Sequence, residues 1–218
     1  MSKRYYWKKF RPILLSVTIC CMFFLLMIGI TSNRTGNLTI FVDRTSVTKC
    51  LSLSESKTLS KPQGKLYGPA INNAWDTTED YLPKYVDLID GNSSGTNYIA
   101  YTFYLFNSGI EELDYTMKFE IENTSNHLDE AIRVRLYTND SLVTYAKKNS
   151  LTGEAESGTT AFESNKYIVT NTVTDFKPEQ YTKYTIMVWV ESDDLDCTND
   201  KIGGSITLSM SFSVLGVL

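Results

Sequence analysis

Residues 97–107 have the sequence NYIAYTFYLFN. Aromatic and β-favouring side chains occupy both alternating sets of positions, so a strand formed here presents apolar side chains to both faces of its sheet. Such a strand is typical of the interior of a sheet whose two faces are both covered. The turn sequence Asn107-Ser108-Gly109 ends the run. The stretch therefore predicts a central β-strand.

The same preference for strands continues through the neighbouring sequence. Runs that alternate apolar and polar residues, or that are rich in β-branched and aromatic residues, are bounded by turn residues at 37–44, 115–122, 132–137, 142–146, 167–173, 181–191 and 205–214. In one of them Arg133 and Arg135 are predicted to face solvent. Residues 51–97 are rich in Gly, Pro, Ser and Asn and predict an irregular insertion. About eight strands and almost no helical period predict an all-β fold, an antiparallel β-sandwich of the jelly-roll or immunoglobulin-like type.

The N-terminal region has a different character. Residues 1–11 carry five basic residues and no acidic residue, and residues 12–30 carry no charge. As a helix, the uncharged segment would rise about 28 Å, close to the ~30 Å hydrocarbon core of a bilayer. Because basic flanks stay on the cytoplasmic side, we expect 1–11 in the cytoplasm, 12–30 in the membrane and 31–218 outside. The segment fits either a permanent signal anchor, giving a single-pass membrane protein, or a signal removed on secretion.

The exported part is acidic. Residues 35–218 hold 15 basic and 25 acidic side chains, a formal charge of −10. Such a surface repels phosphate backbones, so nucleic acid is not expected as a partner. About 184 residues suffice for one domain with one sizeable core. We therefore expect a single extracellular domain over residues 31–218.

Two features of the exported part are candidates for a disulfide and a metal site. Cys50 and Cys197 lie outside the predicted membrane segment, where an oxidising environment permits a bridge; two free thiols are the alternative. A loop rich in carboxylates follows residue 190, and calcium, a hard cation with oxygen ligands, would relieve their mutual repulsion. The alternative is a solvated acidic loop without metal. The candidate ligands are Glu191, Asp193, Asp194, Asp196 and Asp200.

The residues offer little support for catalysis. His127 is the only histidine, lies in a polar turn and is interpreted as exposed. Gly91-Asn92-Ser93-Ser94-Gly95 matches the G-x-S-x-G pattern, but a hydrolase elbow needs a helix after the serine, and a β-rich run follows instead. The aromatic residues of 97–107 are interpreted as core rather than as a sugar-binding platform. We therefore expect a protein that is not an enzyme and has no resident cofactor apart from a calcium ion.

In layout the chain resembles a known family. The aromatic strand that ends in Asn107-Ser108-Gly109, and the segment from Val188 to Gly204 (VWVESDDLDCTNDKIGG), look like those of the exported jelly-roll proteins of Gram-positive bacteria typified by the TasA and camelysin group. The resemblance covers about residues 35–214, and its specific part is the last 40 residues of that span. It implies a subunit of extracellular biofilm-matrix fibres, which assemble when a strand of one subunit completes the sheet of the next.

Two functional hypotheses follow for the exported domain. The first is a non-catalytic structural or adhesive surface protein that assembles by strand addition with its own copies or with related surface proteins, with residues 37–44 as the donor strand. The alternative is a membrane-anchored binding module for a glycan or protein ligand.

Overall fold

A computed structural model describes residues 37–48, 50–70 and 74–215. They belong to one compact unit, Gly36–Leu218. The predicted cytoplasmic segment 1–11 and membrane segment 12–30 lie outside the described residues. Within the described part of the chain, no helix combines the length and the apolar character that a bilayer crossing needs.

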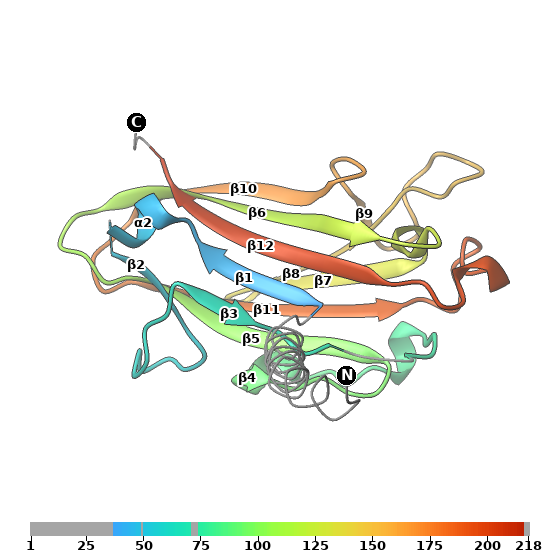
Figure 1. Cartoon of the computed structure of the whole chain (residues 1–218), viewed down its shortest axis with the longest axis horizontal. Coiled ribbons are helices and arrows are strands. Elements are labelled where there is room, and N and C mark those ends of the chain that lie inside the picture. Colours follow the sequence, from blue (N-terminus) through green and yellow to red (C-terminus); the bar gives the residue numbers. More distant parts are fainter. Residues whose placement is uncertain (1–36, 49, 71–73, 216–218) are drawn as a thin grey trace, which may run out of the picture. The chain divides into compact units, whose positions relative to one another are not determined.

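The described residues form two β-sheets with very little helix (Figure 1). The five-stranded sheet has the order β10-β6-β12-β1-β3. Its neighbouring strands are antiparallel except for β1, which runs parallel to β12. The strands are β1 (Leu38–Val42), β3 (Lys65–Tyr67), β6 (Leu113–Thr124), β10 (Tyr167–Phe176) and β12 (Ile206–Val214).

The seven-stranded sheet has the order β2-β5-β11-β7-β8-β9, and β4 pairs with β5 on the same edge as β2. The central strands β5, β11 and β7 are antiparallel to one another. The strands are β2 (Leu51–Ser54), β4 (Gly91–Asn92), β5 (Tyr98–Asn107), β7 (Ile132–Thr138), β8 (Ser141–Ala146), β9 (Thr160–Ala161) and β11 (Tyr181–Val190).

Helical structure is confined to single turns. A short α-helix follows β1, and four 3-10 turns lie in the loops. They are α2 (Arg44–Thr48), η1 (Glu79–Tyr81), η2 (Val86–Leu88), η3 (Leu128–Glu130) and η4 (Asn199–Lys201). The all-β prediction is confirmed, and each predicted strand outside the insertion corresponds to an observed strand with ends shifted by a few residues.

The core lies between the two sheets and is formed by alternate residues of their strands. Phe103 and Tyr184 of the seven-stranded sheet stack with ring centroids 5.5 Å apart, and Phe212 of the other sheet packs 5.3 Å from Tyr184. Tyr115 joins them, and its hydroxyl lies 3.0 Å from that of Tyr184. The two hydroxyls satisfy each other where no water reaches, as buried polar groups require.

The insertion at 51–97 supplies a second layer on the outer face of the seven-stranded sheet. We call residues 74–90 the strap. Leu82 and Val86 of the strap form a small apolar cluster with Ala100, Met187 and Trp189 of β5 and β11. Both faces of these two strands are therefore buried, which confirms the central strand predicted from residues 97–107.

The surroundings of the two arginines of β7 differ from those predicted, and the strap accounts for those of Arg135. Arg133 and Arg135 face away from the core between the sheets, as predicted, but they are buried, with 6% and 8% exposure. The prediction that they face solvent is wrong. The Arg135 guanidinium lies 5.1 Å from the centre of the Trp189 ring and forms an ion pair with Glu79 of the strap. The strap thus replaces water over this face.

Candidate functional site

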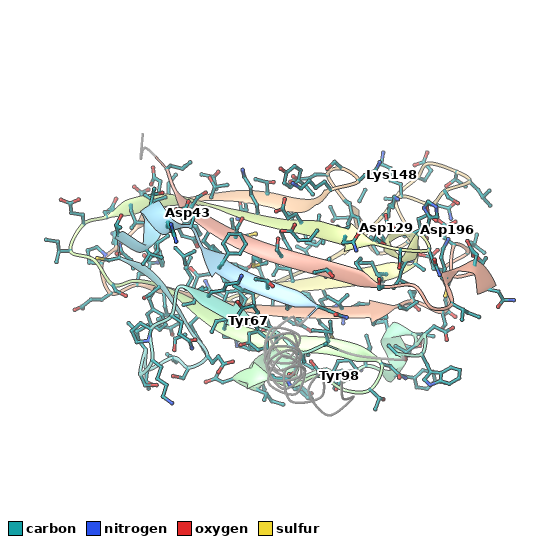
Figure 2. All side chains as sticks on the ribbon, viewed as in Figure 1. Asp43, Tyr67, Tyr98, Asp129, Lys148 and Asp196 are labelled. Carbon is teal, nitrogen blue, oxygen red and sulfur yellow. The ribbon has the colours of Figure 1, made fainter. Side chains whose placement is uncertain are left out.

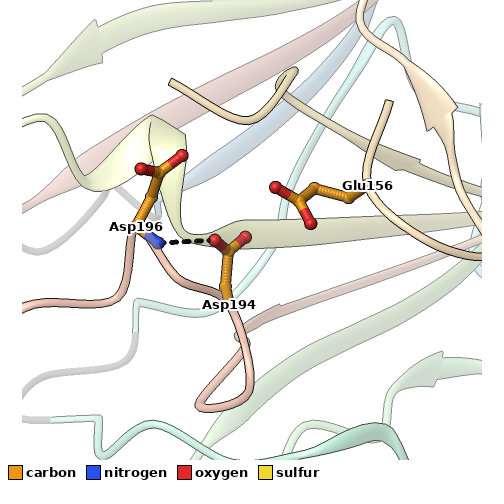
Figure 3. Close-up of side chains that lie close together, drawn as sticks. All are labelled: Glu156, Asp194 and Asp196. Atoms are coloured by element: carbon orange, nitrogen blue, oxygen red, sulfur yellow. Dashed lines mark hydrogen bonds between the residues drawn. The ribbon is translucent and has the colours of Figure 1, made fainter. Parts of the chain in front are cut away.

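One end of the sandwich gathers buried charge. Its loops come from the strands β7, β8 and β11, and Figure 2 shows Asp129, Lys148 and Asp196 at this end, with Asp43 at the opposite end. The oxygen atoms of Glu156, Asp194 and Asp196 lie within 4.8 Å of one another. Glu156 approaches from the loop between β8 and β9, and the two aspartates come from the loop after β11 (Figure 3).

Local hydrogen bonds hold the two aspartates in place. The backbone N–H of Asp196 donates to Asp194 Oδ1 at 2.8 Å, which folds the loop into a tight turn. The backbone N–H of Ser150 donates to Asp196 Oδ2 at 2.9 Å, and the Ser150 hydroxyl donates to the other oxygen. Asp196 therefore ties the β8–β9 loop to the loop after β11.

Arg133 supplies the counter-charge of this cluster. Its Nη1 lies 2.5 Å from Asp194 Oδ2, and its Nη2 lies 3.7 Å from Glu156 Oε2. The side chain of Asp194 is fully buried. Glu156 Oε1 is also buried and has no hydrogen-bond partner among the described residues. The arrangement is an ion-pair network in which most of the carboxylate oxygens already have partners.

The structure brings together only two of the five predicted calcium ligands. Glu191 accepts from the Trp189 indole Nε1–H at 2.9 Å and so belongs to the layer beneath the strap. Asp193 and Asp200 are exposed, and Asp200 pairs with Lys201 at 3.1 Å. The five-residue site predicted from sequence is therefore not formed. Glu156 takes part instead, and calcium binding at the smaller cluster stays a prediction.

Cys50 and Cys197 are far apart, and both are free. Cys50 directly precedes β2, which pairs with the C-terminal end of β5. Cys197 lies in the loop after β11, beyond the N-terminal end of β5. A ten-residue strand is about 33 Å long, whereas a disulfide needs Cα atoms within ~7 Å. The structure therefore has the two free thiols that were the alternative to a bridge.

Other sequence candidates keep structural roles. His127 is in a turn with its side chain 76% exposed, as predicted. The G-x-S-x-G segment forms β4 and a turn that leads into β5, so no helix follows the serine. Tyr101 and Phe103 lie in the core between the sheets, and Tyr104 and Phe106 are buried on the other face of β5. These aromatic residues are core, as expected, and form no exposed sugar platform.

Comparison with known proteins adds no functional assignment. No known protein family and no curated protein matches the chain. Among solved structures, two crystal structures of the β-glucosidase from Kluyveromyces marxianus, one with glucose and one labelled with selenomethionine, share 12% and 13% identity and TM-scores of 0.25 and 0.24. Each comparison covers 73% of this chain, which spans only 15% and 16% of the enzyme. At this level the likeness carries no argument.

The ion pair between Arg133 and Asp194 should stabilise the domain. Asp194→Asn leaves the buried Arg133 without its close partner, and we expect a loss of about 3 kcal/mol in the free energy of unfolding, measured by chemical denaturation. Glu156→Gln is the matched control, because Glu156 lies farther from Arg133 and one of its oxygens has no partner. Equal losses in both variants would contradict this assignment.

Calcium binding at the cluster can be tested by calorimetry. Calcium takes six to eight oxygen ligands, whereas here Arg133 and Ser150 occupy most of the carboxylate oxygens. We therefore expect no saturable heat of binding when millimolar calcium is added to the domain formed by residues 36–218. A heat that Glu156→Gln abolishes and Asp193→Asn preserves would establish a calcium site at Glu156, Asp194 and Asp196.

The thiols of Cys50 and Cys197 should differ in reactivity. Burial raises the pKa of the Cys197 thiol, and the carboxylates of Asp76, Asp194 and Glu191 raise it further, so little thiolate is present at neutral pH. Cys50 is exposed. We expect iodoacetamide to modify Cys50 much faster than Cys197, as followed by peptide mass spectrometry. Equal rates in the folded domain would show that the Cys197 loop opens readily.

Proposed function

We propose that the chain is a non-catalytic cell-surface or exported structural protein of the jelly-roll type that assembles by strand addition. Residues 12–30 would tether it to the membrane as a permanent anchor, or would do so only until they are removed on secretion. In this proposal the protein is a fibre subunit of the TasA and camelysin type or a membrane-tethered relative of such a subunit. The open edge of β10 is the observation that carries the proposal.

Strand β10 is a ten-residue strand at the edge of its sheet and pairs only with β6 among the described strands. The backbone N–H of Thr170 points away from β6, because it donates to Glu163 Oε1 at 2.8 Å. Residues 169–173 pair with β6 in regular register, so the backbone groups of Thr172 point outward as well. Among the described residues they have no backbone partner.

Glu163 and its loop cover the start of this edge through bonds to Ile168 and Thr170, but the edge from Thr172 onward lacks the usual protection against pairing. Natural edge strands are commonly blunted by charged residues or proline, yet residues 167–174 (YIVTNTVT) contain neither. Their β-branched side chains favour an extended backbone. Register shifts interrupt the pairing with β6 only near the two ends of β10, which leaves a regular middle section. A strand from another molecule could extend the sheet here through main-chain hydrogen bonds.

The donor predicted from sequence, residues 37–44, is engaged within its own chain. Its strand β1 lies between β12 and β3, and Leu38 and Ile40 are fully buried. To serve as a donor, β1 would have to leave its own sheet and give up this burial, on the order of 2 kcal/mol for each large apolar side chain. In the proposal, exchange of β1 between copies is therefore the slow route and addition at β10 the direct one.

Thr172→Pro tests the β10 edge. Proline removes the outward N–H and places its ring where an added strand would pair, while the bonds between β10 and β6 use other residues. We expect concentration-dependent assembly of the exported domain to be lost, as measured by light scattering coupled to size-exclusion chromatography. The matched control, Thr172→Ser, keeps the N–H and should assemble normally.

Deletion of residues 31–44 separates the two routes. If the deleted protein still folds and assembles, β1 is not the donor, and the β10 route stands. If Thr172→Pro assembles as well as the parent protein, addition at β10 is wrong. A protein that stays monomeric at all concentrations would contradict the assembly proposal as a whole.

A further inference from the structure

The strap carries apolar side chains on both of its faces. Leu82 and Val86 point toward the seven-stranded sheet, where they are buried. Four large apolar side chains before, between and after these two are exposed, from 52% for Ile89 to 83% for Tyr81. We call this outward set the apolar strip, and it consists of Tyr81, Tyr85, Leu88 and Ile89. Large apolar side chains that gather in this way mark a contact surface rather than ordinary solvent-facing sequence.

Most of the acidic residues of the strap form ion pairs or hydrogen bonds with other residues of the domain. Glu79 pairs with Arg135, and Asp87 Oδ2 lies 3.8 Å from Lys183 Nζ. Asp90 Oδ1 accepts from the Tyr104 hydroxyl at 2.6 Å. Lys84 is exposed amid the apolar strip. Asp76 and Asp80 are exposed as well, so the outward side of the strap combines aromatic rings, aliphatic side chains and one cation with two exposed carboxylates. The aromatic and aliphatic side chains are of the kind that favours the headgroup region of a bilayer.

The covalent path of the chain limits how far this surface can lie from the membrane. Seven residues, 31–37, separate the uncharged segment from Leu38. Even fully extended they reach only about 25 Å. The carbonyl of Leu38 accepts from the N–H of Gly68 at 2.8 Å, and six residues later the chain begins the strap. The strap therefore starts only six residues after a residue that is hydrogen-bonded to Leu38, the first residue of β1.

We propose that the apolar strip, together with Lys84, docks on the headgroup region of the bilayer that holds residues 12–30. This inference rests on the membrane tether of the proposed function and adds an orientation to it. Tyr81 and Tyr85 lie at the level of the headgroups, Leu88 and Ile89 reach the acyl boundary, and Lys84 meets lipid phosphate. The edge of β10, in the other sheet, stays free for strand addition.

Fluorescence quenching by brominated lipids tests this contact in the full chain. The parent variant carries Trp7→Phe and Trp75→Phe, which leaves the buried Trp189 as an internal standard. Leu88→Trp then places a reporter on the strip, and Ile110→Trp places one on an exposed loop as the matched control. Both are read in phosphatidylcholine–phosphatidylglycerol nanodiscs that hold one chain each, so a second copy cannot cover the strip.

We expect brominated lipid to remove most of the added emission of Leu88→Trp and little of that of Ile110→Trp. Equal quenching of both reporters, or of neither, in a chain that elutes with the nanodiscs would overturn the docking and leave the tether intact. A chain that does not elute with the nanodiscs would overturn the tether itself, and the docking with it. If the apolar strip is covered only in nanodiscs that hold two chains, it contacts a second copy of the chain, and the docking on lipid is wrong.

Discussion

The two central strands β5 and β11 carry apolar side chains on both faces, and both faces have to be kept from water. The other sheet covers one face through the aromatic contacts around Tyr184 and Phe212. The strap covers the other through Leu82 and Val86. Burial of this kind is the main favourable term in folding, so the strap is part of the fold rather than a loop attached to it. The buried arginines of β7 follow from the same constraint.

Regular alternation is what made most strands predictable from sequence. Runs such as 115–122 and 205–214 bury one face only, and a period of two identifies such a strand without knowledge of its partners. The arginines of β7 show that alternation does not predict which outward-facing side chains become buried. Alternation correctly placed Arg133 and Arg135 on the face away from the core. Nothing local indicated that residues 74–90 would cover Arg135, or that Glu156 and Asp194 would pair with Arg133. The burial of these residues depends on contacts between segments far apart in sequence.

The acidic end of the sandwich illustrates the same limit for a site. The density of carboxylates after residue 190 identified the correct loop, and Asp194 and Asp196 do converge. Glu156 was missed because it lies in a loop whose only sequence signal is polarity. The partner that neutralises the cluster, Arg133, is on a strand. A buried arginine needs an acidic partner, but nothing in the sequence indicated that Arg133 is buried.

The place of β1 in its sheet has a consequence for synthesis. Leu38 pairs with Leu208, so one of the first strands of the domain to be made lies beside the last. Until residues 206–214 have emerged, the apolar face of β1 lacks its principal neighbour, and the five-stranded sheet cannot close. Pairings so distant in sequence slow folding and lengthen the time during which strand edges are open. Closure of the five-stranded sheet therefore requires that almost the whole domain has been synthesised.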